Sequence, residues 1–212
     1  IGTDAHIVQP ILHSLLQEAV AQTFNRITVD GDTSTNDACV LFATGVAVHP
    51  KLTARDHPAT PAFYAALLDL CQELALKIVR DAEGATKLVA VEVHGGRSVA
   101  ECQTLAYTVA HSPLVKTALF ASDPNWGRIL AAVGRAPIEA LDVSGVDIHL
   151  DEVAVILGGS PASSYTEAQG KQIFSRPQFS IRIGLGRGTA AGCVWTCDLS
   201  HDYVKINAEY RS

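Results

Sequence analysis

The spacing of apolar residues along this chain changes from a helical period to a strand period. Between residues 4 and 24 the apolar positions recur every three or four residues, which predicts an amphipathic helix. A second helix is predicted to open at Thr60, with Pro61 in its first turn, and to end near Gly84. Its buried face is predicted to carry Phe63, Leu67, Leu70, Leu74 and Ile78. Both helices are therefore expected to pack on a core.

Short apolar runs and alternating runs predict the strands. Segments 26–32 and 38–45 are predicted to form two strands joined by a polar turn, and Leu-Val-Ala-Val-Glu-Val at 88–93 predicts another. Beyond Gly134 the runs are separated by turn residues, and one helix is expected at 165–174. The strands expected in this part of the chain are 146–150, 152–157, 179–186, 193–199 and 203–210.

Two polar patterns predict further helix starts. Ser98 and Glu101 have the S-x-x-E spacing of a capping box, in which each side chain accepts a hydrogen bond from a backbone N–H group of the first turn. Asp123 followed by Pro124 has the pattern of an N-cap and a first helical residue, which predicts a short helix over 125–134.

Helices dominate the first part of the chain and strands the last, with the change between residues 112 and 135. The predicted fold class is therefore α/β or α+β, with mixed β-sheets layered with helices. We expect a helix-rich α/β part over residues 1–118 and a strand-rich C-terminal domain over residues 119–212.

Composition narrows the class of protein. The 212 residues include no methionine, so we expect a piece of a longer gene product or a processed chain, and this length buries roughly 70% of the unfolded surface. The net charge of -6 without clustered Lys or Arg argues against nucleic acid, and no apolar run reaches the ~20 residues of a membrane span. An odd number of irregularly spaced cysteines favours a reducing cytosol; they are Cys39, Cys71, Cys102, Cys193 and Cys197.

Asp30, Asp32 and Thr33 follow a predicted strand in the D-x-D-x-T order of haloacid-dehalogenase-type phosphatases. In that interpretation the two carboxylates would supply a nucleophile and a general acid beside Mg²⁺. No downstream G-D-x-x-x-D motif completes such a metal site, and the same residue types are common in turns. A plain turn is therefore the favoured alternative.

Three other features have ordinary explanations. Gly184–Gly188 reads Gly-Leu-Gly-Arg-Gly, but a strand rather than a helix follows it, which favours a hairpin turn over a phosphate-binding loop. Cys193 and Cys197 lack zinc-ligand spacing and are expected to be small core residues. His94 is expected at a solvent-facing strand end, the alternative being a catalytic base without a nameable partner.

Four longer blocks occur in order through the chain: TFNRITVDGDTSTND, AEGATK, SPLVKTALFASDPNWGRI and the final CDLSHDYVKINAEYRS. Together they resemble the β chain of bifunctional ornithine acetyltransferases, also called glutamate N-acetyltransferases. The resemblance implies the self-cleaving DmpA/ArgJ-like fold, in which residues 1–118 share a layered core with an α chain. It also implies that the end of the 119–212 domain returns to the active site.

The resemblance implies a mechanism as well. A precursor of this family cuts itself before a threonine, which then carries the acetyl group from N2-acetylornithine to glutamate, while a Thr-Gly pair of the α chain forms the oxyanion hole. This sequence opens at Ile-Gly-Thr-Asp-Ala-His, without the family's T-M-L context. The nucleophilic threonine is therefore expected just upstream of Ile1, no catalytic residue is expected in this chain, and Thr3 is expected to help cap the first helix.

Three substrate-binding residues follow from the family pattern. Glu83 matches the family's substrate-binding glutamate, and its carboxylate suits the ammonium group of ornithine. Asn207 and Ser212 match two further contacts, whose amide and hydroxyl suit an amino-acid carboxylate. Capping and packing are sufficient roles for the remaining motif residues, which are Asp123, Asn125, Trp126 and Arg128.

The implied protein is a cytoplasmic enzyme of arginine biosynthesis that works as an α2β2 assembly with the α chain. No metal and no cofactor are expected, although acetyl-CoA is a second acetyl donor in some members of the family. No nucleic acid or membrane partner is expected. Two alternatives stay open at this point: a self-processed amidohydrolase or aminopeptidase of the same architecture, and a non-catalytic interaction subunit.

Overall fold

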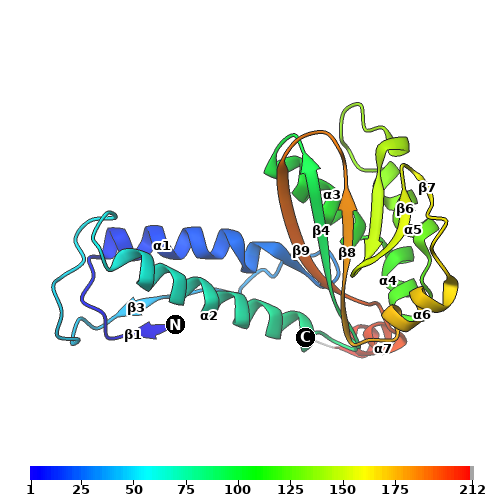
Figure 1. The fold of residues 1–212 in the computed structure, drawn as a ribbon. Coiled ribbons are helices and arrows are strands. Elements are labelled where there is room, and N and C mark those ends of the chain that lie inside the picture. Colours follow the sequence, from blue (N-terminus) through cyan, green and yellow to red (C-terminus); the bar gives the residue numbers. More distant parts are fainter. Residues whose placement is uncertain (211–212) are drawn as a thin grey trace. The chain divides into compact units, whose positions relative to one another are not determined.

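The computed structural model describes residues 1–210, which form two compact units (Figure 1). The first unit comprises Ile1–Arg26 and Asp32–Lys77, and the second comprises Ile27–Gly31 and the chain from Ile78 onward. The boundary expected between residues 118 and 119 falls inside α4 (Pro113–Phe120), within the second unit.

The first unit is built on two helices, α1 (Gln9–Gln22) and α2 (Thr60–Arg80). Leu12, Leu15 and Ala19 of α1 share a buried cluster with Leu67 and Cys71 of α2. The short strands β1 (Gly2–Thr3) and β3 (Phe42–Ala43) pair in parallel, and the 3₁₀ turn η1 (Phe24–Arg26) follows α1.

The predicted start of the first helix is wrong by five residues. The structure places α1 from Gln9 with Pro10 in its first turn, because proline lacks the N–H that a helix interior requires. The residues before it are extended, and Ile7 bridges to Leu52. Thr3 does not cap α1: its Oγ1 accepts a hydrogen bond from Ala5 N at 3.2 Å, and Val8 is the N-cap.

The second unit contains a seven-stranded mixed sheet in the order β2-β9-β4-β8-β5-β6-β7. The long strand β4 runs parallel to β8 and antiparallel to β9, as predicted for a mixed sheet. The strands are β2 (Ile27–Thr28), β4 (Leu88–Gly96), β5 (Asp147–Leu150), β6 (Val153–Leu157), β7 (Ser160–Pro161), β8 (Gln178–Gly184) and β9 (Ala190–Cys197).

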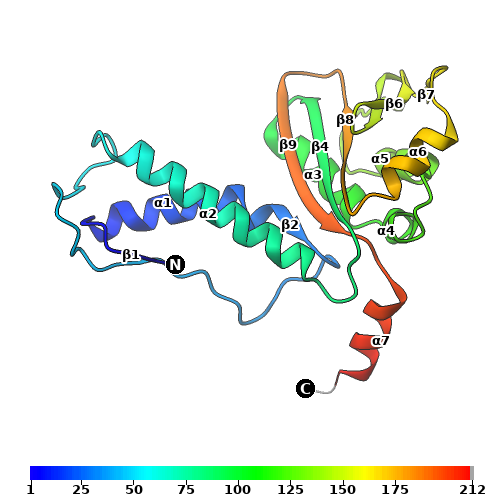
Figure 2. The same cartoon turned by 60° about the horizontal axis from the view of Figure 1, so that its bottom comes forward.

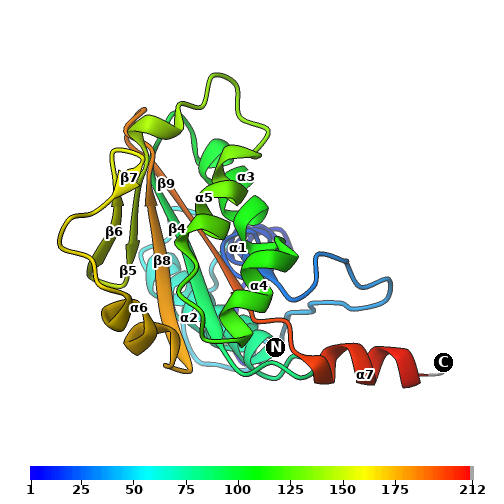
Figure 3. The same ribbon diagram turned by 90° about the vertical axis from the view of Figure 1, so that its right-hand side faces the viewer.

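Three helices cover one face of this sheet: α3 (Val99–Ala110), α4 and α5 (Trp126–Gly134) (Figure 3). Alternate residues of β4 and β8, such as Val91 and Ile181, are buried in one cluster with Leu105 of α3 and Ile129 of α5. Burial of each such side chain contributes about 1.5–3 kcal/mol, so this layer is the main core. The short 3₁₀ turn η2 (Val143–Gly145) precedes β5, and α6 (Glu167–Phe174) precedes β8.

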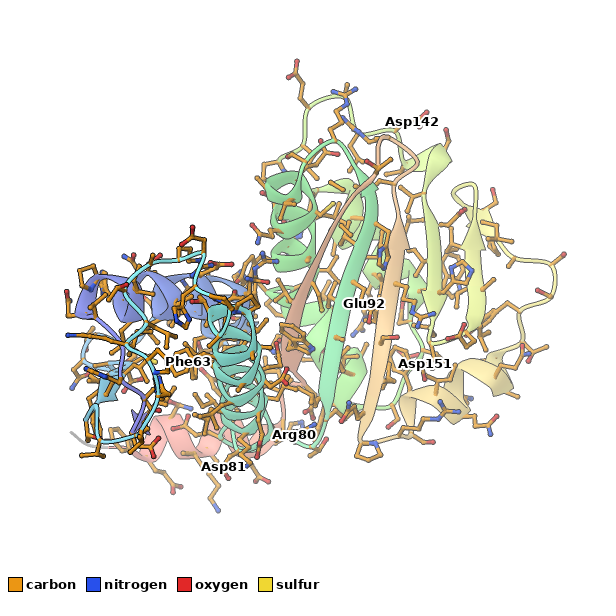
Figure 4. All side chains as sticks on the ribbon, turned by 60° about the vertical axis from the view of Figure 1, so that its left-hand side comes forward. Phe63, Arg80, Asp81, Glu92, Asp142 and Asp151 are labelled. Atoms are coloured by element: carbon orange, nitrogen blue, oxygen red, sulfur yellow. The ribbon has the colours of Figure 1, made fainter. Side chains whose placement is uncertain are left out.

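The other face of the sheet carries polar residues. Glu92 alternates with the buried valines of β4 (Figure 4), and its Oε2 lies 3.2 Å from Nε of Arg182 on β8. Nη1 of Arg182 also reaches Oε1 of Glu152 at 3.0 Å. His94 is exposed at the end of the strand, with Nε2 3.6 Å from Oε2 of Glu92, in agreement with the solvent-facing alternative.

Strand pairing near residues 26–45 differs from the prediction. The two predicted strands do not pair with each other, because β2 joins β9 of the sheet while β3 joins β1. The loop at Gly184–Gly188 is a turn but not a hairpin, since β4 lies between β8 and β9. Leu185 N donates to His94 O, and Arg187 N and Gly188 N donate to Gly95 O, so the loop is fixed to the end of β4.

Helices were underestimated in the C-terminal half. Residues 203–210, expected as a strand, lie mostly in α7 (His201–Glu209), capped by Ser200. The helix α4 was not predicted, and α5 is capped by Asn125 rather than Asp123, with Asn125 Oδ1 accepting from Arg128 N at 3.2 Å. Within residues 1–210, no helix is long and apolar enough to cross a bilayer.

Candidate functional site

The candidate site lies where the loop of residues 81–87, between α2 and β4, meets α7 (Figure 2). Gly84 has φ of +66° and approaches the start of α7 so closely that a Cβ there would lie 2.5 Å from Ser200 Oγ and 2.7 Å from Tyr203 N. Glycine is therefore required at position 84 both by its backbone conformation and by this contact. Glu83 directly precedes it.

The loop is also held by Asp198, which follows β9. Asp198 Oδ1 accepts hydrogen bonds from Thr86 N at 2.8 Å and from Lys87 N at 2.9 Å, and Oδ2 accepts from Thr86 Oγ1 at 2.7 Å. Asp198 is 3% exposed, so these charge-assisted bonds compensate for the removal of its carboxylate from water.

Glu83 and Asn207 form a direct contact. Nδ2 of Asn207 donates to Glu83 Oε2 at 2.8 Å across 124 residues of sequence, and also to Tyr203 O at 3.0 Å. Because Nδ2 has two hydrogens, both are used, and Oδ1, an acceptor, is the part of the amide left to face a ligand. Both residues are exposed, and together they present a carboxylate and an amide oxygen, which suits a cationic group more than an anionic one.

Tyr203, one turn before Asn207 on α7, connects this site to residue 30. Its Oη donates to Asp30 Oδ2 at 2.8 Å, which gives Asp30 a structural partner. No group of three or more His, Cys, Asp or Glu side chains that could hold a metal ion occurs within the described 210 residues. Residues 29–31 form a bend after β2, with Gly31 at φ of +97°, in agreement with the turn interpretation of this segment.

Two buried lysines lie beside Asp198. Lys116 Nζ donates to Thr196 Oγ1 at 3.0 Å and to Cys197 O, and Lys87 Nζ donates to Leu119 O and to Ser122 Oγ at 2.6 Å each. Burial lowers the pKa of both lysines, while the nearby Asp198 charge acts in the opposite direction. Burial likewise raises the pKa of the Cys197 thiol.

The Asp-Pro-Asn-Trp-Gly-Arg motif has a structural role in the fold. Nη1 of Arg128 donates to Leu114 O at 2.9 Å and to Thr117 Oγ1 at 3.3 Å, which ties α5 to α4. Nδ2 of Asn125 donates to Asp123 Oδ2 at 3.1 Å. A hollow of about 450 Å³ borders the motif and is lined by residues that include Asp123, Trp126 and Tyr165.

The structure brings together two of the three residues expected to bind substrate, Glu83 and Asn207. Ser212 lies outside the described residues. Sequence reasoning missed Gly84, Ser200 and Asp198, which hold the two segments in place. Asp-Leu-Ser directly before α7, a pattern typical of an N-cap, was the signal for Asp198 and Ser200, while Gly84 was recognised as a residue that ends a helix but not as a contact of α7.

A mixed sheet covered on one face by helices, with an exposed carboxylate–amide pair from distant segments, defines a layered α/β protein with a polar surface site. The sequence profile described as the ArgJ family matches residues 1–212, and the chain belongs to that family. The arginine biosynthesis bifunctional protein ArgJ of Pseudomonas fluorescens (strain Pf0-1) is 53% identical over 212 residues, which are 100% of this chain and 52% of that protein.

Other relatives agree with this assignment. The arginine biosynthesis bifunctional protein ArgJ of Psychrobacter arcticus is 55% identical over 100% of this chain and 52% of its own length. A crystal structure of the arginine biosynthesis bifunctional protein argJ from Bacillus halodurans has a TM-score of 0.93 and 40% identity, covering 99% of this chain and 98% of that one. The fold class and the family resemblance are thereby confirmed, and the chain spans about half the length of the curated relatives it matches.

Proposed function

We propose that this chain is the β chain of an ornithine acetyltransferase, a glutamate N-acetyltransferase that moves an acetyl group from N2-acetylornithine to glutamate in arginine biosynthesis. Family membership over residues 1–212 supports the reaction class, and the names of the relatives place those proteins in arginine biosynthesis. The observation within the chain that carries the proposal is the contact of Glu83 with Asn207, whose acceptor groups fit the ammonium of ornithine.

In this proposal the chain supplies substrate binding and the rest of the protein supplies the bond-making groups. This chain is 52% of the length of its relatives. From the family resemblance, the α chain is the proposed source of the oxyanion hole, and a threonine outside this chain is the proposed acetyl carrier. Ser212 is proposed to complete the substrate contacts, and an α2β2 assembly is proposed for the whole protein.

The test is a steady-state assay of the whole protein with acetylornithine and glutamate. Glu83→Gln removes the negative charge without changing the size of the side chain, and we expect KM for acetylornithine to rise about tenfold or more, as for a lost charged hydrogen bond. The matched control is Glu73→Gln, an exposed glutamate that pairs with Lys77, and it should leave KM unchanged. An unchanged KM in Glu83→Gln would contradict the assigned binding role.

The product distinguishes the reaction classes. Formation of acetylglutamate supports acetyl transfer, whereas release of acetate without acetylglutamate would support the amidohydrolase alternative instead. A processed protein that binds acetylornithine but forms neither product would support a non-catalytic interaction subunit.

A further inference from the structure

Three buried charged residues, Asp198, Lys116 and Lys87, link segments that are far apart in the sequence. Asp198 is 3% exposed, Lys116 3% and Lys87 8%. Lys116 lies on α4, Lys87 directly precedes β4, and Asp198 lies between β9 and α7. Burying such charges is unfavourable unless they are fully hydrogen-bonded, so their bonds constrain where these segments can lie.

The hydrogen bonds of Asp198 end on the loop that carries Glu83. Both carboxylate oxygens of Asp198 are used by Thr86 and Lys87, three and four residues after Glu83. Lys116 holds the backbone at Cys197, directly before Asp198, and Leu199 N donates to Lys116 O at 3.2 Å. The loop that carries Glu83 is therefore attached to the same short segment that leads into α7.

The close contact between Gly84 and the start of α7 restricts the loop further. A Cβ at this position would lie 2.5 Å from Ser200 Oγ, the atom that accepts from Tyr203 N and caps α7. Asp198 holds the loop three and four residues after Glu83, and α7 packs on Gly84 directly after it, so the backbone at Glu83 is held close to Asn207.

We propose that Asp198 is a positioning residue for substrate binding, which acts by fixing the loop of Glu83 against α7 so that Glu83 and Asn207 form one subsite for a cationic amino acid. This inference rests on the proposed function, because it assigns Asp198 to the same substrate-binding pair. Asp198 itself is buried, and the proposed role is to hold the loop rather than to bind the substrate.

The decisive variants are Asp198→Ala and Asp198→Asn in the whole protein, assayed with acetylornithine and glutamate. Alanine removes all three hydrogen bonds, and we expect KM for acetylornithine to rise about tenfold with a smaller change in kcat. Asparagine can still accept from both backbone N–H groups and can donate to Thr86 Oγ1, so it should restore KM to within about threefold of the wild type.

A purely structural role would give a different result. It would lower kcat through loss of folded protein, leave KM unchanged in the fraction that folds, and show no rescue by asparagine. That pattern would overturn the inference. The control is Asp81→Ala, an exposed aspartate at the start of the same loop (Figure 4), which should leave KM unchanged.

A second variant keeps the test decisive if Asp198→Ala does not fold. Gly84→Ala leaves the three buried charges intact but pushes the loop away from Ser200, and we expect the same rise in KM. An unchanged KM in Gly84→Ala would overturn the inference.

A double-mutant cycle separates this inference from the proposed function. If Asp198 acts through Glu83, then Glu83→Gln with Asp198→Ala should be no worse than Glu83→Gln alone. If Glu83→Gln raises KM but the Asp198 and Gly84 variants do not, the positioning role fails and the proposed function stands. If Glu83→Gln itself has no effect on KM, both fail.

Discussion

His111 shows how a single side chain can make the stability of the second unit depend on pH. Its Nε2 lies 3.0 Å from Thr28 Oγ1, and its ring lies 5.2 Å from that of Tyr107. Desolvation is the largest cause that lowers the pKa of His111, followed by the charges of Lys116 and Arg135, while Asp30 acts in the opposite direction. The folded protein therefore holds the His111 proton less tightly than the unfolded chain does.

The sign of the effect follows from that difference. Above pH 6.5, the ordinary value, His111 is neutral in both states and has no effect; as the pH falls below 6.5 the unfolded chain takes up the proton first, and stability is lost down to the lowered pKa. We expect the free energy of unfolding to fall more between pH 8 and pH 5.5 in the wild type than in His111→Gln.

Urea denaturation at the two pH values measures this difference. His13→Gln, at an exposed histidine of α1, is the control and should keep the pH dependence of the wild type. Equal pH dependence in His111→Gln and the wild type would show that His111 does not carry the effect.

At the scale of an element, α6 begins with a complete capping box. Thr166 Oγ1 accepts from Gln169 N at 3.4 Å, and Gln169 Oε1 accepts from Thr166 N at 2.9 Å. Thr166→Ala removes the cap, and we expect it to lower the free energy of unfolding by about 1 kcal/mol. The matched variant Ser175→Ala, at the other end of α6, loses only an exposed bond to Gln172 O and should cost less. Equal losses in thermal or urea unfolding would contradict the capping assignment.

The capping box predicted at Ser98 and Glu101 is confirmed in one half only. Ser98 Oγ accepts from Glu101 N at 3.1 Å, but Glu101 Oε1 accepts from Arg97 N at 3.2 Å instead of from the N-cap. Glu101 also lies 3.4 Å from Nε of Arg187, in the loop between β8 and β9. A local pattern identified the helix start, while a residue distant in sequence decided the second contact.

The same limit explains which elements were predictable. Strands such as β4 and β8 bury alternate residues under helices, and their pattern alone identified them. The segment of α7 has no buried residue, so no apolar helical stripe marks it. Tyr203, Val204 and Ile206 are residue types that favour strands, and the segment was therefore predicted as a strand. Glu83 and Asn207 came from the family pattern, but their contact depends on Asp198 and Gly84, which no local signal joins to them.

At the scale of the whole molecule, the two units differ in the size of their cores. The buried apolar cluster of the first unit is limited to a few side chains of α1, α2 and the segments around Ala5 and Leu52. The buried cluster of the second unit includes side chains of the helices α3 to α6 and of the strands β4 and β8. Apolar side chains of the first unit also face solvent, among them Phe42 and Val46. Less buried area per residue gives lower local stability.

We therefore expect native-state hydrogen exchange of this chain to separate the units. Amides of α1 should exchange through a partial opening at a lower free energy than amides of β4 and β8, which should require global unfolding. With added denaturant, the opening free energies of the two sets of amides should become equal only near the unfolding midpoint. A single opening energy for α1 and β4 would contradict the division into two compact units.

The order of strands in the sheet has a consequence for synthesis on the ribosome. Both neighbours of β4, namely β8 and β9, follow it late in the chain. The valines of β4 therefore emerge long before the backbone groups that will pair with them have been translated. Throughout that interval the nascent polypeptide displays an unpaired apolar segment, which is the kind of surface that chaperones recognise and that drives aggregation when synthesis stalls.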